Sequence, residues 1–388
     1  MAAPPIQGLW FQLGIDIDGE AQGDQSGISV ALSSDGSVVA VGARHNDGGG
    51  TNSGHVRVFV LTGFQWEQRG EDLNGEAAFD GFGSSVSLSS DGTVLAVGAN
   101  VHDGPNGVNS GQVRVFMWNG RSWVARGPSI SGAAGGDWFG TDVSLSKDGT
   151  VVAGGAWFGA SSFGHVRIFA WNGMEWVQRG MALDGSATND SFGYSLDMSS
   201  DASVVVCGGW GDDTRGRDAG NVRVFGWSGS SWIQIGSDLT GTNAEDRFGR
   251  SVAISGDGTV VAAGAPDGNY CRVFRFDGNT WSQVGQTLHG EAENDMFGNS
   301  IDLSEDGNTL VVGAYANNED SGQVRVFQLV SNRIWFQSRD GIVGELSGDQ
   351  FGYALAVSAD ASTIAIGARF NNGRGDRAGH VRVYWNIS

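Results

Sequence analysis

One pattern of residues occurs seven times along the chain, and this repetition constrains the fold more than any other feature. In each copy a tryptophan is followed 14 residues later by an aspartate, then by a second aspartate 11 residues further on and a glycine seven residues after that. A period of roughly 50 residues is typical of propellers and solenoids. The 388 residues are therefore expected to form one repetitive domain, although length alone predicts two or three.

Within one copy, the residues alternate as in four antiparallel strands. In the second copy, residues 82–89 alternate and end in a turn at 90–93, and the nearly all-apolar segment 94–99 reads as a buried strand. A third strand at 112–118 leads through Asn119-Gly120, a strong hairpin signal, into a fourth. Seven such units predict an all-β, seven-bladed β-propeller of four-stranded antiparallel blades.

The two ends of the chain indicate how the propeller closes. The chain starts with a fourth-strand segment (residues 10–14) and stops after a third-strand segment (residues 380–384). The N-terminal strand is therefore expected to complete the last blade, which removes the open edges that a solenoid would have to cap. We expect a single domain over 1–388, with blades at about 26–75, 82–132, 139–185, 192–241, 248–290, 297–344, and 351–388 plus 6–19.

The charge and composition exclude several classes of partner. The net charge is −20, from 23 basic and 43 acidic residues. Such a surface repels phosphate backbones and anionic lipid, so neither nucleic acid binding nor membrane insertion is expected. Residues 1–7 have no apolar core of the kind found in signal peptides, as would also be expected of a chain trimmed to its mature domain. No apolar run reaches 18 residues, and the two cysteines are too few for a disulfide framework.

Two polar positions recur in every copy and are expected to be structural. We predict that the arginine of each third strand clamps the aspartate before each first strand through bidentate contacts. The recurring tryptophan is expected in the core. The arginines are Arg57, Arg114, Arg167, Arg223, Arg272, Arg325 and Arg382, and the aspartates are Asp24, Asp80, Asp137, Asp190, Asp246, Asp295 and Asp349.

Most variation between the copies lies in the loops between the second and third strands, here called the B–C loops. In a propeller these loops emerge on one face, and function most often lies on loops held by a rigid scaffold. Aromatic side chains beside Asp and Asn commonly grip sugar rings, although such rings also pack against neighbouring blades. The candidate ligand-binding residues are Trp157, Phe158, Trp210, Asp212, Asp213, Tyr270, Tyr315, Arg374 and Asp376, the last two within an Arg-Gly-Asp tripeptide.

The motifs of common catalytic, phosphate-binding and metal sites are absent. The chain has no C-x-x-C, H-E-x-x-H, G-x-S-x-G or P-loop motif. We therefore assign no catalytic, cofactor-binding or metal-binding residue from the sequence. A hydrolase remains an alternative because propellers host enzymes whose residues are scattered over several blades.

The repeat resembles the FG-GAP repeat of integrin α-subunits and of secreted and surface proteins of bacteria and algae. The resemblance rests on Asp-x-Phe-Gly followed by apolar-Gly-Ala, as in residues 80–83 and 97–99. It implies the seven-bladed fold, an extracellular or cell-surface setting, and adhesion or ligand binding by the loop face. The Ca²⁺ motif of integrin repeats is replaced here by a short turn with one carboxylate, so the calcium sites are not carried over.

We therefore expect a non-enzymatic extracellular or surface module that binds a glycan or a protein through its B–C loop face. The alternatives are a hydrolase of surface polysaccharide or lipid anchors, and a structural assembly subunit.

Overall fold

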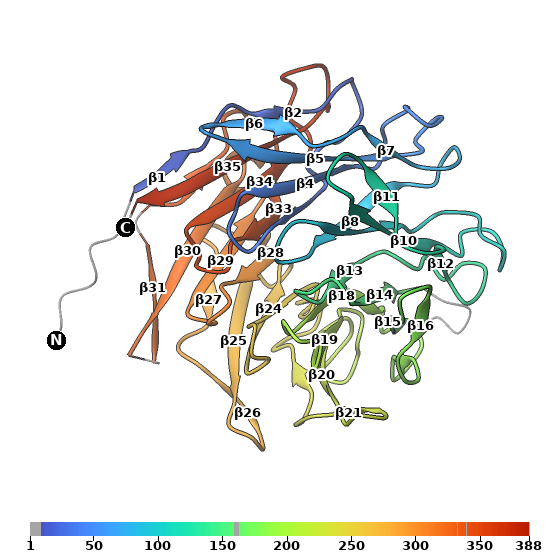
Figure 1. Cartoon of the computed structure of the whole chain (residues 1–388). Helices are drawn as coiled ribbons and strands as arrows, with labels where there is room; N and C mark the ends of the chain where they lie inside the picture. Colours follow the sequence, from blue (N-terminus) through green and yellow to red (C-terminus); the bar gives the residue numbers. More distant parts are fainter. Residues whose placement is uncertain (1–8, 159–162, 332, 339, 388) are drawn as a thin grey trace.

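The protein consists of seven antiparallel β-sheets arranged around a central channel (Figure 1). A computed structural model describes residues 9–158, 163–331, 333–338 and 340–387. In each sheet the first strand lines the channel and later strands follow outward in chain order, so each sheet is one blade. The predicted all-β, seven-bladed propeller is confirmed.

The blades share one plan. Blade 1 contains β3 (Ser29–Leu32), β4 (Val38–Ala43), β5 (His55–Thr62), β6 (Gln65–Gln68) and β7 (Leu73–Asn74). Blade 2 contains β8 (Phe82–Leu88), β9 (Val94–Ala99), β10 (Gln112–Trp118), β11 (Trp123–Ala125) and β12 (Ile130–Ser131). Blade 3 contains β13 (Val143–Leu145), β14 (Val151–Ala156), β15 (His165–Trp171), β16 (Trp176–Gln178) and β17 (Leu183–Asp184). Blade 4 contains β18 (Phe192–Met198), β19 (Val204–Gly209), β20 (Asn221–Trp227), β21 (Trp232–Gln234) and β22 (Leu239–Thr240).

The remaining three blades repeat this order. Blade 5 contains β23 (Ser251–Ile254), β24 (Val260–Ala265), β25 (Tyr270–Phe276), β26 (Trp281–Gln283) and β27 (Leu288–His289). Blade 6 contains β28 (Phe297–Leu303), β29 (Thr309–Ala314), β30 (Gln323–Val330), β31 (Ile334–Gln337) and β32 (Ile342–Val343), with the short helical segment α1 (Asn317–Asp320) in its B–C loop. Blade 7 contains β33 (Phe351–Val357), β34 (Thr363–Ala368) and β35 (His380–Ile387), completed by β1 (Leu9–Gln12) and β2 (Ile17–Asp18).

The fourth strand of each blade is split into two segments that pair with the same third strand. In blade 1, both β6 and β7 pair with β5. Each blade therefore has four strand positions, as predicted, although the outermost position holds two short strands.

The two ends of the chain close the propeller. Strand β1 pairs antiparallel with β35, with Trp10 opposite Asn386, and β2 continues the same edge with Ile17 opposite Val381. Figure 1 shows these first and last strands side by side, in blue and red. The prediction that the N-terminal strand completes the last blade is confirmed.

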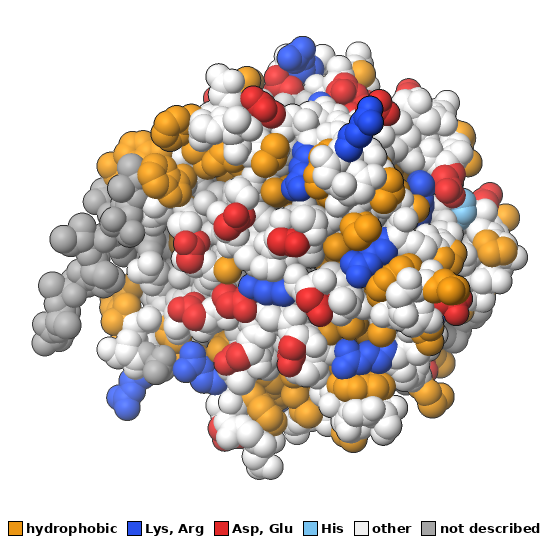
Figure 2. All heavy atoms as spheres, in the orientation of Figure 1, with side chains coloured by type: hydrophobic (Ala, Val, Ile, Leu, Met, Phe, Trp, Pro, Cys, Tyr) orange, Lys and Arg blue, Asp and Glu red, His pale blue; other side chains and the backbone are white. Residues whose placement is uncertain are grey.

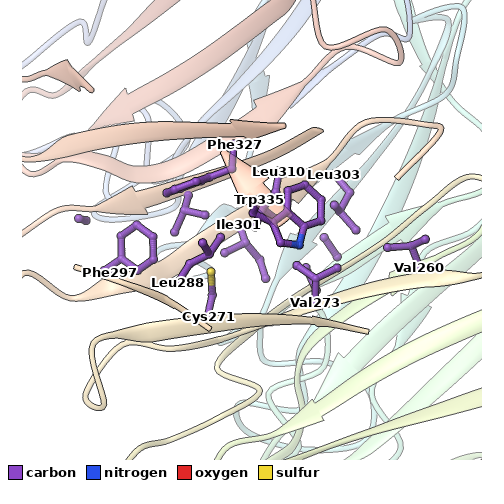
Figure 3. Packing of buried hydrophobic residues seen from close by; sticks show 14 residues of the cluster. Val260, Cys271, Val273, Leu288, Phe297, Ile301, Leu303, Leu310, Phe327 and Trp335 are labelled. Carbon is purple, nitrogen blue, oxygen red and sulfur yellow. The ribbon is translucent and has the colours of Figure 1, made fainter. Parts of the chain in front are cut away.

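The hydrophobic core is divided into seven clusters, one between each pair of neighbouring blades. Figure 3 shows the cluster between blades 5 and 6, where Cys271 and Leu288 meet Phe297 and Trp335. Because a single blade cannot bury both faces by itself, every blade depends on two neighbours for its core.

A close backbone contact explains why the Phe-Gly and Gly-Ala motifs recur together. In blade 2, a Cβ added to Gly98 would collide with the carbonyl oxygen of Gly140, which follows the phenylalanine of blade 3. The hydroxyl of Ser85 donates to the same carbonyl oxygen at 2.9 Å. The phenylalanine itself, such as Phe139, is fully buried. The two motifs therefore form one inter-blade joint.

A closed ring of seven backbone hydrogen bonds surrounds the channel at the end where the first and second strands turn. Each N–H donates to the equivalent carbonyl of the next blade at 2.8–3.0 Å. The ring runs through Ser34, Ser90, Lys147, Ser200, Gly256, Glu305 and Ala359 and returns to Ser34.

Acidic side chains gather around the middle of the face seen in Figure 2, in keeping with the net charge of −20.

The recurring arginines and aspartates do not pair as predicted among the described residues. Each aspartate is almost fully buried and accepts hydrogen bonds from backbone N–H groups three or four residues earlier, as Asp80 does from Glu76 and Ala77 at 3.1 and 2.8 Å. Each arginine except Arg382 donates to a carbonyl of the preceding blade, as Arg114 does to Asn74. The carboxylate of each aspartate thus stabilises its own turn, whereas the arginine contacts the neighbouring blade.

The same arginines lie over the buried phenylalanine rings. The guanidinium carbon of Arg223 is 4.0 Å from the centre of the Phe192 ring. Six of the seven recurring tryptophans, all but Trp10, add a third joint, because their indole N–H groups donate to carbonyls of the preceding blade, as Trp123 does to the Arg69 carbonyl at 2.8 Å. Both positions are therefore structural, through inter-blade contacts.

Candidate functional site

The channel widens into a cavity of about 520 Å³ that is lined by the first strands of all seven blades. The residue after each Phe-Gly pair, or after Ser26-Gly27 in blade 1, points into this cavity. We call these seven positions the inner ring. They are Ile28, Ser84, Thr141, Tyr194, Arg250, Asn299 and Tyr353.

A second set of variable residues follows the second strand of each blade, at the start of the B–C loop. We call these positions the outer ring: Arg44, Asn100, Trp157, Trp210, Pro266, Tyr315 and Arg369. Three of them, Arg44, Asn100 and Trp157, also line the cavity. The residues of the inner and outer rings differ from blade to blade, whereas the adjoining Phe-Gly and Gly-Ala motifs stay nearly constant. The side chains at the cavity mouth are therefore not needed for the contacts between blades, which leaves them available for function.

An aromatic cluster forms one side of the mouth, at blades 3 and 4. The ring of Trp157 lies 5.5 Å from Trp138, 5.7 Å from Tyr194 and 6.3 Å from Trp210, centre to centre. Phe158 lies 5.5 Å from Trp157 and is half exposed. The rings contact one another edge to face or at a tilt, which are favourable arrangements for aromatic pairs.

Arginines form part of the same mouth. Arg250 lies over the Tyr194 ring at 5.0 Å, and Arg369 lies over the Tyr353 ring at 3.5 Å. Arg44 donates through Nε to His45 at 2.9 Å. Among the described residues, none of these three arginines forms an ion pair with a carboxylate. In so acidic a protein, cations without carboxylate partners leave an opening suited to an anion.

Three aspartates lie deeper in the channel. Asp142, Asp197 and Asp302 each accept a hydrogen bond from a backbone N–H of the next blade, at 2.8, 3.0 and 2.7 Å. Burial raises the pKa of Asp142 to about 7, of Asp197 to about 6 and of Asp302 to about 7. The charge of Asp197 adds to the rise at the other two. These carboxyl groups therefore join neighbouring first strands and can exchange protons near neutral pH.

These aspartates were not among the residues predicted from the sequence, although the repeats carry a signal for them. Asp142 occupies a first-strand position held by serine in five of the other blades, and Asp197 and Asp302 occupy one held by serine or alanine. Ser87 shows the ordinary role of that second position, because its hydroxyl accepts a hydrogen bond from Leu145 N–H at 3.0 Å. Comparing the repeats column by column would have marked all three carboxylates.

The far end of the channel carries an ion pair. Lys147, the only lysine of the chain, pairs with Glu305 from the opposite side. Both residues line a smaller cavity of about 170 Å³, which shares Asp197 and Asp302 with the larger one. The larger cavity is the one that residues at the start of the B–C loops line, so it lies toward the B–C loop face.

The structure brings together only part of the predicted ligand-binding set. Trp157, Phe158 and Trp210 belong to the aromatic cluster at the mouth. Tyr315 packs on Tyr353 of the inner ring, with ring centres 5.5 Å apart. These four residues support a site at the channel mouth.

Asp212, Asp213 and Tyr270 lie in structural positions. Asp212 is buried and accepts from Thr214 N–H at 3.0 Å, and Asp213 accepts from Asp218 N–H at 2.8 Å, so both carboxylates hold their own loop. Tyr270 was expected in a loop but is the first residue of β25 and is 4 % exposed. The B–C loop of blade 5 is short, which brings this tyrosine into the sheet.

The Arg-Gly-Asp tripeptide lies apart from the channel cavity. Arg374 and Asp376 are exposed on the B–C loop of blade 7, and Arg374 faces Asp18 with Nε 3.3 Å from the carboxylate. Neither residue lines the 520 Å³ cavity.

The fold and this cavity define a class of protein, a seven-bladed β-propeller with a ligand-sized opening on its loop face. The model of the FG-GAP repeat matches residues 16–59, 74–116, 240–271 and 281–327. The chain thus carries FG-GAP repeat matches in four segments and folds as a seven-bladed β-propeller, as the resemblance implied.

A solved structure shares the architecture. The crystal structure of a putative 6-phosphogluconolactonase from Bacteroides uniformis aligns with a TM-score of 0.58 and 13% identity, over 83% of this chain and 87% of that chain. At this identity the likeness is one of fold. No curated protein matches the sequence significantly. Within the described ranges, no helix is long and apolar enough to cross a membrane.

Proposed function

We propose that this protein is a recognition module that binds an acidic glycan at the mouth of its central channel. The observation that carries the proposal is the combination of aromatic rings and arginines without carboxylate partners around one 520 Å³ cavity. The size of this cavity falls in the range of small-ligand sites, about 300–1,000 Å³.

The aromatic cluster supplies apolar faces for sugar rings. Trp157 and Tyr194 are only partly buried and both line the cavity, so each can stack with a pyranose. The amides of Asn100, from blade 2, and Asn299, from blade 6, line the same cavity. Amide groups can donate to and accept from sugar hydroxyls, which favours a polyhydroxylated ligand over a purely apolar one.

The arginines favour a ligand that carries a carboxylate or a sulfate. Arg44 and Arg250 line the cavity and have no carboxylate partner among the described residues. A guanidinium group offers bidentate donors that match the geometry of these anions. An acidic saccharide satisfies both the aromatic and the cationic parts of the site.

The test is an array of neutral, uronate-containing and sulfated oligosaccharides, followed by calorimetry on the strongest binder. We expect binding to acidic members and an affinity at least tenfold lower for Arg250→Ala. The matched control is Arg215→Ala, which removes an exposed arginine from a B–C loop outside the cavity lining and should leave the affinity unchanged. Equal losses in both variants would indicate a general charge effect, and a blank array would contradict the proposal.

A hydrolase is the second candidate, favoured by the three channel carboxyl groups whose pKa values lie near neutrality. Carboxyl groups of this kind serve as acids and bases in glycoside hydrolysis. Here, however, each carboxylate already accepts backbone hydrogen bonds, as Asp302 does from Leu303 and Val357. Release of reducing ends from a bound acidic glycan, abolished in Asp197→Asn with binding retained, would favour the hydrolase.

The proposed ligand also suits an extracellular or cell-surface setting. The FG-GAP repeats support this setting by analogy, and the net charge of −20 suits a protein that stays dispersed in saline surroundings. Fractionation of the native source into cell-surface and cytoplasmic material would test it, and an exclusively cytoplasmic pool would contradict it.

A further inference from the structure

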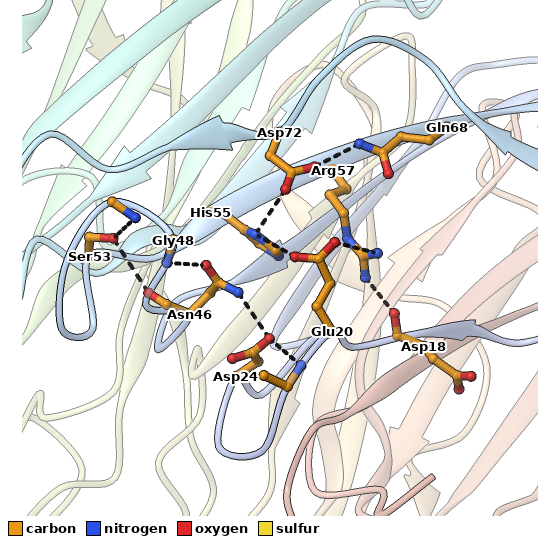
Figure 4. A network of polar contacts seen from close by, with 12 residues as sticks. Asp18, Glu20, Asp24, Asn46, Gly48, Ser53, His55, Arg57, Gln68 and Asp72 are labelled. Atoms are coloured by element: carbon orange, nitrogen blue, oxygen red, sulfur yellow. Dashed lines mark hydrogen bonds and ion pairs between the residues drawn. The ribbon is translucent and has the colours of Figure 1, made fainter. Parts of the chain in front are cut away.

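A second polar cluster lies between blades 7 and 1, at the residues labelled Glu20, His55 and Asp72 in Figure 4. His55 begins β5, Asp72 directly precedes β7 of the same blade, and Glu20 follows β2 of blade 7. One ligand atom from each of the three side chains lies within 4.8 Å of the other two. The cluster is separate from the channel, since none of the three residues lines either channel cavity.

The imidazole of His55 has a buried nitrogen without a hydrogen-bond partner. His55 is 1 % exposed, and its Nδ1 makes no hydrogen bond. This nitrogen points between Glu20 Oε2 at 3.8 Å and Asp72 Oδ2 at 3.9 Å. Both separations are too long for hydrogen bonds. A buried polar atom without a partner is costly, so an arrangement of this kind calls for a group that fills the gap.

Both carboxylates are held from their outer side. Gln68 donates through Nε2 to Asp72 Oδ1 at 2.7 Å, and the Arg57 guanidinium lies 3.6 Å from Glu20 Oε1 (Figure 4). The remaining oxygen of each carboxylate therefore faces His55. Outer partners that hold one oxygen and aim the other are characteristic of metal ligands in proteins.

Blades 2 and 6 show how another residue at the position of His55 fills this gap. In blades 2 and 6 the His55 position holds a glutamine, which donates directly to the equivalent glutamate, as Gln112 does to Glu76 at 3.2 Å and Gln323 to Glu291 at 3.3 Å. Glutamine thus closes the contact that histidine leaves open.

Blade 7 has the same residue types at these positions, but the charge of its aspartate is already balanced by an arginine. His380 corresponds to His55, and Asp16 corresponds to Asp72. Both oxygens of Asp16 accept hydrogen bonds from Arg382, at 2.9 and 2.8 Å. Blade 7 therefore offers a comparison in which the aspartate is already paired with an arginine, although Asp18 also lies within 4.8 Å of Asp16 and His380.

We propose that Glu20, His55 and Asp72 bind a divalent transition-metal ion of the Zn²⁺ type. One imidazole and two carboxylates suit Zn²⁺ and its neighbours better than Ca²⁺, which prefers six to eight oxygens. Bonds of about 2.0–2.2 Å around such an ion place the ligand atoms roughly 3.4 Å apart, so both carboxylate oxygens must move about half an ångström closer to His55 Nδ1 and also approach one another. Glu20 and Asp72 are 44% and 30% exposed, so water completes the coordination.

The test is calorimetric titration of the full-length, chelator-treated protein with ZnCl₂, together with the visible absorption of bound Co²⁺. We expect one saturable site and Co²⁺ bands of a nitrogen–oxygen ligand set. His55→Gln should lower the Zn²⁺ affinity at least tenfold and remove the bands. Because glutamine occupies this position in two other blades, the variant is expected to fold, which circular dichroism checks.

His380→Gln is the matched control and should keep both the affinity and the Co²⁺ bands. Asp72→Ser provides a second variant, since blade 2 has Ser129 at that position, and it should weaken Zn²⁺ binding as His55→Gln does. Saturable binding that is the same in wild type and His55→Gln, or no saturable binding to the wild type, would overturn the proposal.

Discussion

Lys147 and Glu305 form an ion pair across the narrow end of the channel and so join blade 3 to blade 6. Ser200 of blade 4 donates to the other oxygen of Glu305 at 2.8 Å. The three residues belong to the same backbone ring. The ion pair therefore adds to blades that the backbone ring already joins, and the charge of Lys147 opposes the rise in the pKa of Asp302.

Replacing Lys147 by methionine should change the electrostatics of the channel more than the stability of the fold. Both partners of the ion pair are about one-third exposed, so we expect a stability change within about 1 kcal/mol. Burial raises the pKa of Asp302, and the charge of Lys147 opposes that rise, so the pKa of Asp302 should increase in the variant. Carboxyl ¹³C shifts followed through a pH titration measure it, with Arg121→Met as a remote control, and an unchanged or lower pKa would contradict the assignment.

Replacing Asp302 by serine should make the protein less sensitive to pH. The pKa of Asp302 is about 7 in the folded protein and 3.8 in its ordinary state. Folding therefore takes up a proton between pH 4 and pH 7, and the stability contributed by this group is lost as the pH rises through that window. Serine can accept from Val357 N–H as Ser87 does from Leu145.

We expect the difference in free energy of unfolding, Asp302→Ser minus wild type, to be roughly 2–4 kcal/mol more positive at pH 8 than at pH 4. Urea denaturation at the two pH values measures it. Asp306→Ala is the control of opposite sign, because hydrogen bonds from Ser304 and Asn308 outweigh burial and lower the pKa of Asp306. If the free energy of unfolding changed equally with pH in Asp302→Ser and in wild type, Asp302 would not titrate in this range.

Adding one methyl group to Gly208 should disrupt the joint between blades 4 and 5. Its Cβ would collide with the carbonyl oxygen of Gly249, and backbone cannot move aside as a side chain can. We expect a loss of roughly 2–3 kcal/mol or more. Gly226→Ala is the matched control, since its Cβ would meet only the end of Ile235 at 3.3 Å, and blade 3 has Ala170 there. Thermal denaturation of the two variants should separate them clearly, and similar melting temperatures would refute the joint.

Two arginines should separate stability from ligand binding. Arg223 lies over Phe192 and donates to the backbone carbonyl oxygen of Asp184 in the preceding blade at 2.6 Å, so Arg223→Ala should cost roughly 2–3 kcal/mol. Its folded fraction should keep the wild-type ligand affinity. Arg250→Ala should show the reverse, a normal melting temperature with weakened binding. Thermal denaturation and ligand calorimetry of both variants test this prediction. If Arg223→Ala lost ligand binding but kept normal stability, the ligand would bind at the joints between blades and not at the channel mouth.

The sequence was sufficient to predict the fold because the frame repeats. The constant spacing between Trp123, Asp137 and Gly155 reflects inter-blade joints that must recur in every blade. Strand count, blade number and closure by the chain ends follow from that repetition. The Arg–Asp pairing was predicted wrongly because the pattern cannot show that Asp137 already accepts from Ala134 N–H.

The site could be predicted only in part, for a different reason. Trp157 and Trp210 stood out as aromatic residues in variable loops, whereas Tyr194 and Arg250 lie within or beside regular first strands. Their orientation into the channel depends on how seven blades converge, which no single repeat reveals. Tyr270 was predicted to lie in a B–C loop, but the loop of blade 5 is short and Tyr270 is already the first residue of β25.

The most direct test of the channel-mouth site is the affinity of the strongest acidic oligosaccharide for wild type and for the double variant Tyr194→Ala/Arg250→Ala, with melting temperature and Zn²⁺ affinity measured in parallel. We predict at least a hundredfold loss of saccharide affinity in the double variant, while its melting temperature and Zn²⁺ affinity stay close to those of wild type. Equal saccharide affinity in the two proteins would place the binding surface elsewhere and contradict the account.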